Sequence, residues 1–376
     1  MLTFFWGIIC MCQGVVKNTS GLIACRFFMG LCKGEFVPGC PYLLSMYYKR
    51  HEFQQRFFLL WAAGLVAGAF GGLLAYALYH MHGWGGYSGW RWIFIIEGLL
   101  SIVSALSAKF LIAEWPERAK FLSSEVKELL KELNACDAGE GARMDRLNGA
   151  AWRRIMTNWK IYCLGITVSG YATVLFVPSI VNSLGYSDIE SQVHSIPTWA
   201  VTAVVTMMVS FLTDCWRHGY GFVIFGVVFA SIGYIILLCR GPLSRGLNVY
   251  VRYMVVFFVT TGCYIAQPVA IVWMASNLSG HYKRAVGLAI QVGYGNIRGI
   301  IASNIFNRDD APLYTVGYGT SLAMIVFCGI MSTIFATGLL IENKKRDQRK
   351  RDDRLQLDED VLDDLSHDDP RFRFSL

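Results

Sequence analysis

Residues 219–239 read GYGFVIFGVVFASIGYIILLC, a run of 21 residues without a charged side chain. A helix needs roughly 20 apolar residues to cross the ~30 Å hydrocarbon core of a bilayer. In lipid, only helices and closed barrels satisfy every backbone hydrogen-bonding group. This run has the length of a helix rather than the ten-residue alternation of a barrel strand. It therefore predicts a transmembrane helix.

Apolar stretches of similar length recur along nearly the whole chain. Of its 376 residues, 54% are hydrophobic and 16% are charged, whereas a soluble domain usually carries about 25% charged residues. The sequence therefore predicts an all-α integral membrane protein with about ten spans. The predicted spans are 2–16, 21–47, 57–79, 92–113, 159–181, 196–213, 219–239, 249–275, 285–305 and 316–341.

The basic residues predict which ends of the spans face the cytoplasm. One alternating set of connections, together with the C-terminal tail, carries 23 of the 34 Lys and Arg residues, and the opposite set carries 6. An excess of Lys and Arg marks cytoplasmic loops. Both termini are therefore expected in the cytoplasm, in a multi-pass protein of the plasma membrane. The net charge of +7 does not indicate nucleic-acid binding, because the basic residues lie in loops rather than in a basic domain.

Two segments outside the spans have a distinct composition. Residues 114–158 predict a cytoplasmic linker with an amphipathic helix, because the apolar residues of 123–134 (SSEVKELLKELN) recur on one helix face. Ser123 and Ser124 suit the N-terminus of that helix, and a structural spacer is its expected role. The tail is basic and then acidic, which predicts a disordered cytoplasmic segment over 342–376. Its basic start is expected to contact anionic lipid.

Four predicted spans precede the linker and six follow it. Many secondary transporters consist of two related six-span halves, with the substrate bound between them. This count predicts an incomplete N-terminal helix bundle over 1–113 and a C-terminal six-helix bundle over 159–341. The chain enters apolar sequence at once, without the charged segment of a signal peptide. We expect a truncated gene prediction or an internal start rather than a natural ten-helix design.

The sequence lacks the residue clusters of an enzyme or a metal site. Its 11 cysteines show no metal-ligand spacing, and its 7 histidines lie mostly in loops without an acid–base or metal pattern. Free cysteine behaves as a small hydrophobe. We therefore expect no catalysis, no metal and no cofactor.

Short motifs along the chain, taken in their order and spacing, resemble one known family. They are Arg26–Gly30 with Pro38-Gly39, Met46–Glu52, Gly89–Gly98, Asn277 with Lys283-Arg284-Ala285, Gly295-Asn296, Asp310–Tyr314 with Gly317, and Phe372–Leu376. The chain resembles the fungal anion:cation symporters of the major facilitator superfamily, the allantoate permease group. Within that group it is most similar to high-affinity nicotinic acid permeases. The resemblance implies the superfamily's two-bundle fold, with the first two of twelve helices missing.

The resemblance also implies a function. A member of this family imports a small organic anion with protons by alternating access, here nicotinate or another carboxylate such as allantoate or pantothenate. It is expected to act as a monomer in lipid, with no nucleic-acid partner. An inactive truncated remnant is the alternative, because a cavity open along one side would expose polar surface to lipid.

Charged residues within one predicted span are the first candidates for a substrate site. Arg26 and Lys33 are seven residues apart and lie on one helix face, where two cations suit a carboxylate. Arg26 matches the superfamily's fourth-helix arginine; pairing with carbonyls or a neighbouring acid is its alternative role. Relatives typically have an acid at Lys33 and a small residue at Glu35, and Glu35 points elsewhere. These changes put proton coupling in question and fit a divergent substrate or a decaying gene.

Polar residues of the second half are further candidates. Gln267, Trp273, Gln291 and Asn296 offer pocket polarity and a stacking surface for an aromatic ring. Interhelical hydrogen bonds are the alternative role for most of them, and Trp273 also suits an interface.

A third group of residues suits gates. The gating candidates are Arg91, Glu97, Asp214, Arg217, Lys283, Arg284 and Arg298. Glu97 and Arg91 suit either an outer-gate ion pair or a structural pair at the interface. Asp214 with Arg217 resembles the inner gating motif of the second half, and Arg298 stands where relatives usually have glycine. Separately, the small residues of Gly64–Gly68, followed by Gly71-Gly72, predict a close helix contact.

Overall fold

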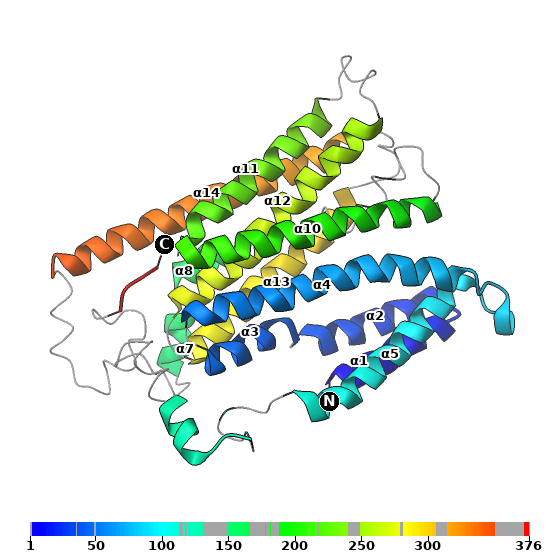
Figure 1. The fold of residues 1–376 in the computed structure, drawn as a ribbon, viewed down its shortest axis with the longest axis horizontal. Coiled ribbons are helices and arrows are strands. Elements are labelled where there is room, and N and C mark those ends of the chain that lie inside the picture. The colour runs from blue at the N-terminus through cyan, green and yellow to red at the C-terminus, as the bar shows by residue number, and fades with distance from the viewer. Residues whose placement is uncertain are drawn as a thin grey trace.

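The protein is described from a computed structural model. The described residues are 2–34, 36–48, 50–112, 116, 119, 121–130, 149–165, 177, 181, 188–216, 218–239, 249–278, 281–305, 314–349 and 372–375. Within these ranges all regular secondary structure is helical (Figure 1). The all-α class predicted from the sequence is therefore confirmed.

The helices follow the apolar runs of the sequence. They are α1 (Leu2–Val15), α2 (Thr19–Gly34), α3 (Phe36–Tyr47), α4 (Arg50–Tyr79), the 3-10 turn η1 (Trp84–Gly86), α5 (Gly89–Leu111), α7 (Gly149–Met156), α8 (Trp159–Gly165), α10 (Asp188–Trp216), α11 (Gly219–Leu238), α12 (Val249–Asn277), α13 (His281–Ile305) and α14 (Thr315–Asp347). Among the described residues, six helices are long and apolar enough to cross a bilayer: α4, α5, α10, α11, α12 and α14.

Several predicted boundaries differ from the structure. Helices α4 and α10 begin seven and eight residues before the predicted spans 57–79 and 196–213. The predicted span 21–47 is described as two helices, α2 to Gly34 and α3 from Phe36, and residue 35 lies outside the described residues. The last helix continues past residue 341 to Asp347, with three basic residues in its final turn. Cations are favourable at a helix C-terminus, so the helix extends beyond the apolar run 316–341 from which it was predicted.

The linker and the tail are partly described. Residues 124–130 are helical, and the Val126 N–H donates to Ser123 Oγ at 3.4 Å, which confirms the predicted N-cap. Val126 and Leu129 are exposed, as an apolar face lying on a membrane would be. In the tail, residues 342–347 continue α14 and residues 372–375 pack against the helices, so the expectation of disorder over 342–376 is wrong for these two segments.

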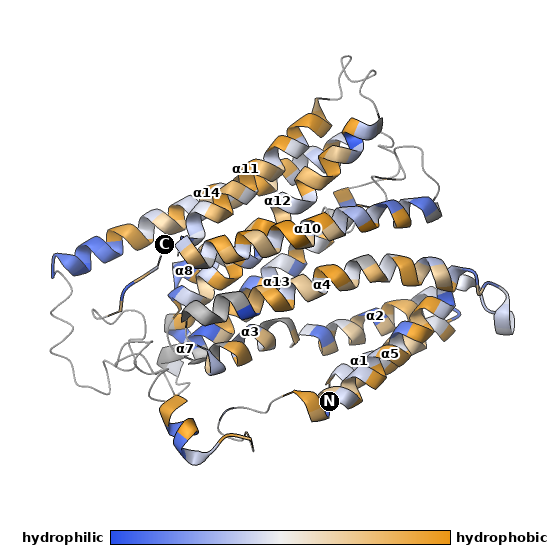
Figure 2. Cartoon of the chain, in the orientation of Figure 1, coloured by the Kyte–Doolittle hydropathy of each residue, from blue (hydrophilic) through white to orange (hydrophobic). Residues whose placement is uncertain are grey.

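The helices pack in an order that links the two halves of the chain. In the first half α1 packs along α5, and in the second half α11 packs along α12 and α14. Helix α4 runs alongside α10, so these two helices join the halves (Figure 1). Apolar residues dominate the long helices, while the end of α14 is hydrophilic (Figure 2). Large apolar side chains such as Phe110, with 86% of its surface exposed, face outward as expected in lipid.

Glycines set the closest helix approaches, although not those predicted. A Cβ on Gly98 would lie 2.6 Å from the Met11 backbone nitrogen, and one on Gly7 would lie 3.0 Å from the Gly98 carbonyl oxygen. These residues let α1 and α5 touch through their backbones. In contrast, a Cβ at Gly64, Gly68 or Gly71 would meet no heavy atom within 4 Å. The predicted contact through this row of α4 is therefore wrong for these three positions.

Candidate functional site

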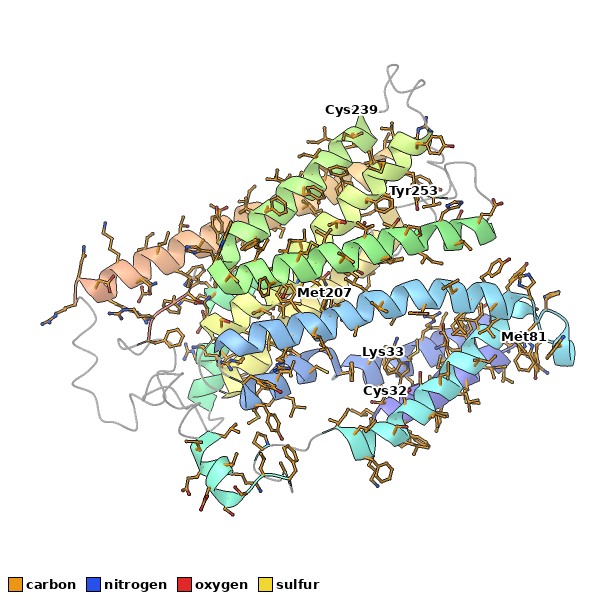
Figure 3. The ribbon with its side chains drawn as sticks, in the orientation of Figure 1. Cys32, Lys33, Met81, Met207, Cys239 and Tyr253 are labelled. Atoms are coloured by element: carbon orange, nitrogen blue, oxygen red, sulfur yellow. The ribbon has the colours of Figure 1, made fainter. Side chains whose placement is uncertain are left out.

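The two candidate cations of α2 lie beside α1 and α5. The Arg26 guanidinium carbon is 5.5 Å from the ring centroid of Phe94 on α5. The Lys33 ammonium is 4.4 Å from the ring centroid of Trp6 on α1, and Figure 3 labels this lysine on its helix. Both distances are within the range of cation–π attraction. The two cations predicted to share a face thus reach the aromatic rings of two different helices.

Glu97 joins these cations from α5. It is the ninth residue of that helix, about 12 Å along its axis from the first residue. Its carboxylate lies near enough to Lys33 for their charges to interact, and Lys33 also interacts with Arg26. Charged groups within a membrane are costly unless they meet one another or a polar cavity. A residue predicted as a gate therefore belongs with the residues predicted to bind substrate.

The space between the two cations is open. Arg26, Gly30 and Lys33 follow one another at intervals of four and three residues, which places them on one face of α2. A Cβ at Gly30 would meet no heavy atom within 4 Å. The rings of Trp6 and Phe94 border the cations on either side. The arrangement offers two positive charges and aromatic surface beside an exposed glycine.

Helix α1 contributes polar groups that sequence reasoning did not select. Gln13 is fully buried, and its Nε2 lies 3.4 Å from Met29 Sδ on α2. Cys10 Sγ lies 3.7 Å from the Phe94 carbonyl oxygen on α5. A glutamine inside the apolar run 2–16 is the one signal that could have identified this helix. The aromatic residues Trp6 and Phe94 gave no such signal in the sequence, because aromatic residues are common in any span.

The candidates of the second half divide into two groups. Gln291 on α13 is fully buried, and its Nε2 donates to the Ala270 carbonyl of α12 at 3.5 Å. Gln267, which is also buried, lies one turn before Ala270 on α12. These two glutamines therefore belong to the α12–α13 interface. Asn296, by contrast, is exposed on α13.

Trp273 has a packing role rather than a place in a pocket. It is 3% exposed, and its ring meets Phe335 edge-on with centroids 4.8 Å apart. Its indole N–H donates to the Ser375 carbonyl at 3.0 Å. The polar edge and one apolar side of the ring are thus occupied by the protein itself. The predicted stacking of a substrate on this ring is not supported.

Two of the gating candidates, Arg91 and Arg284, have described contacts at helix ends. The Arg91 guanidinium carbon lies 5.2 Å from the Trp90 ring centroid and 5.5 Å from that of Tyr87, both near the start of α5. Arg284 Nε donates to the Leu278 carbonyl at 3.1 Å, which ties the start of α13 to the end of α12. Lys283, beside it, is buried.

The other gating and coupling candidates are only partly described. Asp214 lies in the last turn of α10 and Arg298 within α13, in each case without a described side chain. Glu35 and Arg217 lie outside the described residues. Their predicted roles stay predictions.

Known proteins resemble this chain over most of its length. The Major Facilitator Superfamily family matches residues 1–303. An uncharacterized transporter of Schizosaccharomyces pombe is 32% identical over 375 residues, which cover 96% of this chain and 72% of the relative. The high-affinity nicotinic acid transporter of Saccharomyces cerevisiae is 28% identical over 387 residues, which cover 99% of this chain and 69% of that protein.

Solved structures share the fold. The proton:xylose symporter XylE, bound to 6-bromo-6-deoxy-D-glucose, superposes with a TM-score of 0.64 at 15% sequence identity. The match covers 90% of this chain and 79% of that one, and it supports the fold alone. The family and these relatives are transporters rather than enzymes. The chain belongs to the major facilitator superfamily.

Proposed function

We propose that this transporter imports a small organic anion, nicotinate or a related carboxylate, together with protons. The observation that carries the proposal is the group formed by Arg26, Lys33 and Glu97 between α1, α2 and α5. The named nicotinic acid transporter among the relatives supports the same substrate class. We place the protein in the plasma membrane as a monomer, with both termini in the cytoplasm.

The charges of this group suit an anion that travels with a proton. With Glu97 ionised, its charge and those of Arg26 and Lys33 leave one net positive charge. When Glu97 takes up a proton, both cations become available, and a carboxylate gains from the change because charges attract strongly in a medium of low dielectric. Anion binding and protonation therefore favour each other. Uptake is expected to rise as the external pH falls.

Alternating access would expose this group to each side in turn. In the superfamily's fold, two bundles rock around a site between them. The contact of α4 with α10 joins the two halves here. Gln267 and Gln291 of the second half are buried at the α12–α13 interface, so we propose that they hold these two helices together while the bundles move.

The test is uptake of radiolabelled nicotinate at acidic and neutral pH, in cells that lack their own carrier. The nicotinic acid transporter of Saccharomyces cerevisiae serves as the positive control. Acid-stimulated uptake by this chain supports the proposal. Suppose instead that the chain reaches the cell surface yet takes up no labelled nicotinate at either pH, and that unlabelled carboxylate competitors leave the signal unchanged. In that case the anion-import proposal fails and the inactive-remnant alternative stands.

Filling the open space at Gly30 is expected to block uptake. In Gly30→Leu, the new side chain occupies the gap between Arg26 and Lys33, so uptake should fall at least about tenfold. Protein yield and thermal midpoint should be unchanged or improved, because leucine is a better helix former than glycine. Gly64→Leu is the matched control, since a Cβ at Gly64 also meets nothing within 4 Å. Equal uptake by both variants would contradict a site at Gly30.

Changing Trp273 tests its assignment to packing. Trp273→Phe removes the N–H that donates to Ser375 and keeps an aromatic ring beside Phe335. We expect the KM for uptake to stay within twofold of the unmodified protein, with a loss of about 1 kcal/mol in stability from the lost hydrogen bond. Measuring KM and the thermal midpoint of the same preparation separates the two effects. A large rise in KM at unchanged stability would return Trp273 to the substrate site.

A further inference from the structure

Four residues near the chain's end, 372–375, lie against the ends of α8, α12 and α14. Phe372 and Phe374 are 4% and 5% exposed, and their rings meet edge-on with centroids 5.2 Å apart. Chain ends usually remain poorly ordered unless specific contacts hold them. We call this segment, Phe372–Ser375, the C-terminal clasp.

Two asparagines hold the backbone of the clasp. Asn343 on α14 accepts from the Phe374 N–H at 3.1 Å and donates to the Phe374 carbonyl at 2.9 Å. Asn277 on α12 does the same for Ser375, at 2.9 Å and 3.0 Å. Each amide side chain thus satisfies the donor and the acceptor of one residue. Such main-chain pairing, with alternate side chains in pockets, is how proteins bind extended peptides.

Two cations surround the second aromatic ring. Lys160 Nζ at the start of α8 is 3.8 Å from the Phe374 ring centroid, and the Arg346 guanidinium carbon is 4.5 Å from it. Arg346 also donates to the Phe372 carbonyl. Both cations are buried, at 6% and 3% exposed. A buried cation gains from the face of an aromatic ring, so removing Phe374 would remove a partner from each of them.

We propose that these three helix ends form a peptide-binding site whose occupant is the chain's own C-terminal clasp. The site selects an aromatic-X-aromatic segment: Phe372 and Phe374 fill it, and the exposed Arg373 pairs with Asp347 at 3.3 Å. The residues that contact the clasp come from three helices: Lys160 from α8, Asn277 from α12, and Asn343 and Arg346 from α14. A bound clasp therefore fastens α8 to α12 and α14. This inference does not depend on which solute is transported.

The tether to α14 keeps the clasp in place. Residues 350–371 join the described end of α14 to Phe372, so the peptide is supplied at the high local concentration of a short linked segment. Severing the tether should let the clasp dissociate and leave a site that accepts the same peptide from solution. An intact chain should resist that exchange.

Peptide binding by a cleavable chain tests the site. A site-specific protease sequence replaces residues 356–362, and the purified protein in detergent is cut and washed after folding. A fluorescent RFRFSL peptide is then titrated by anisotropy. We expect saturable binding to the cut chain and at least tenfold weaker binding to the uncut chain. Equal binding to both would overturn a clasp bound in cis, and binding to neither would overturn the site.

Variants identify the contacts in the same assay. Asn277→Ala combined with Asn343→Ala should abolish peptide binding, as should a peptide with both phenylalanines changed to alanine. Asn304→Ala is the matched control, because Asn304 donates to the Ile300 carbonyl of its own helix α13 at 2.8 Å. Loss of binding in the control as large as in the double variant would contradict the assignment.

Cysteine reactivity tests the fastening of α8 in the uncut protein. Cys163 on α8 is 8% exposed, and Cys263 within α12 is 4% exposed. In Phe374→Ala, alkylation of Cys163 should accelerate several-fold while that of Cys263 stays unchanged, as quantified for each cysteine by peptide mass spectrometry. Parallel acceleration of both would indicate general loosening, and no change in either would mean that α8 does not need the clasp; each result overturns this part of the proposal.

Discussion

Replacing Gly262 with valine is expected to destabilise the protein more than any other change considered, because this glycine lies where α12 meets the backbone of α11. A Cβ at Gly262 would lie 2.5 Å from the Ala230 nitrogen, 2.6 Å from the Gly226 carbonyl oxygen and 2.8 Å from the Ala230 Cβ. These atoms belong to the backbone or to a side chain without rotamers, so they cannot turn aside. The two helices would have to separate.

The expected cost follows from overpacking. Inserting extra carbon atoms into a tightly packed core costs about 1–3 kcal/mol, and occasionally more. For a protein of this size, we expect the thermal midpoint of Gly262→Val in detergent to fall by roughly 2–4 °C. Small residues allow close approach of membrane helices, so the contact area between α11 and α12 would shrink as well.

The matched control is Gly221→Val on α11, where a Cβ would meet no heavy atom within 4 Å. Its midpoint should stay within about a degree of the unmodified protein. Thermal unfolding of both variants, followed by size-exclusion chromatography after heating, checks the difference. If both variants lose the same stability, the close contact of α11 with α12 is not where the structure places it.

Glycines also show what a sequence reveals about helix contacts. The row at Gly64, Gly68 and Gly71 has the spacing of a contact face, yet the space beside these three positions is open. Gly7 and Gly98, which do form a contact, lie in different helices and have no such row. A small residue permits close approach of two helices, but a contact forms only where a second helix packs against that residue. Six of the ten predicted spans coincide with described helices that are long and apolar enough to cross a bilayer, because an uncharged run such as 219–239 has one stable form in lipid.

The candidate site was predictable in part for a similar reason. Arg26 and Lys33 stood out because charge inside an apolar span is costly. Glu97 stood out as well, but its place near Lys33, 64 residues earlier in the chain, depends on how α1 packs against both α2 and α5. The C-terminal clasp was missed because the acidic stretch before it predicts disorder. Four residues are too few to change the average composition of the tail. Its partners, Asn277 and Asn343, look ordinary in the sequence.

The second large effect is expected at Lys33. In Lys33→Gln, the site loses one of its two cations and Glu97 loses its neighbouring positive charge, so nicotinate uptake should fall by at least about 100-fold. This corresponds to roughly 2.7 kcal/mol, which is of the order expected when a charged hydrogen-bond partner of the anion is lost. Initial uptake rates, normalised to surface protein, measure the loss. Lys109→Gln is the matched control, because Lys109 lies in the last turn of α5.

Glu97→Gln should have a different effect. The glutamine imitates the protonated acid, so both cations stay available to the anion at any pH. We expect nicotinate exchange across the membrane to persist while the stimulation of uptake by acid disappears. The measurement is the ratio of uptake rates at acidic and neutral pH, with exchange measured in preloaded cells. Uptake that still rises in acid would assign the proton to another group.

The double variant Lys33→Gln/Glu97→Gln separates a transport role from a structural one. Removing one of two opposite charges within a membrane span leaves the other uncompensated, whereas removing both relieves that cost. If the pair serves only stability, the double variant should recover the surface expression and the uptake that Lys33→Gln loses. If Lys33 binds the substrate, expression should recover and uptake should not. Neutralising one acid requires only one cation. The second cation and the open space at Gly30 therefore favour a role in binding an anion.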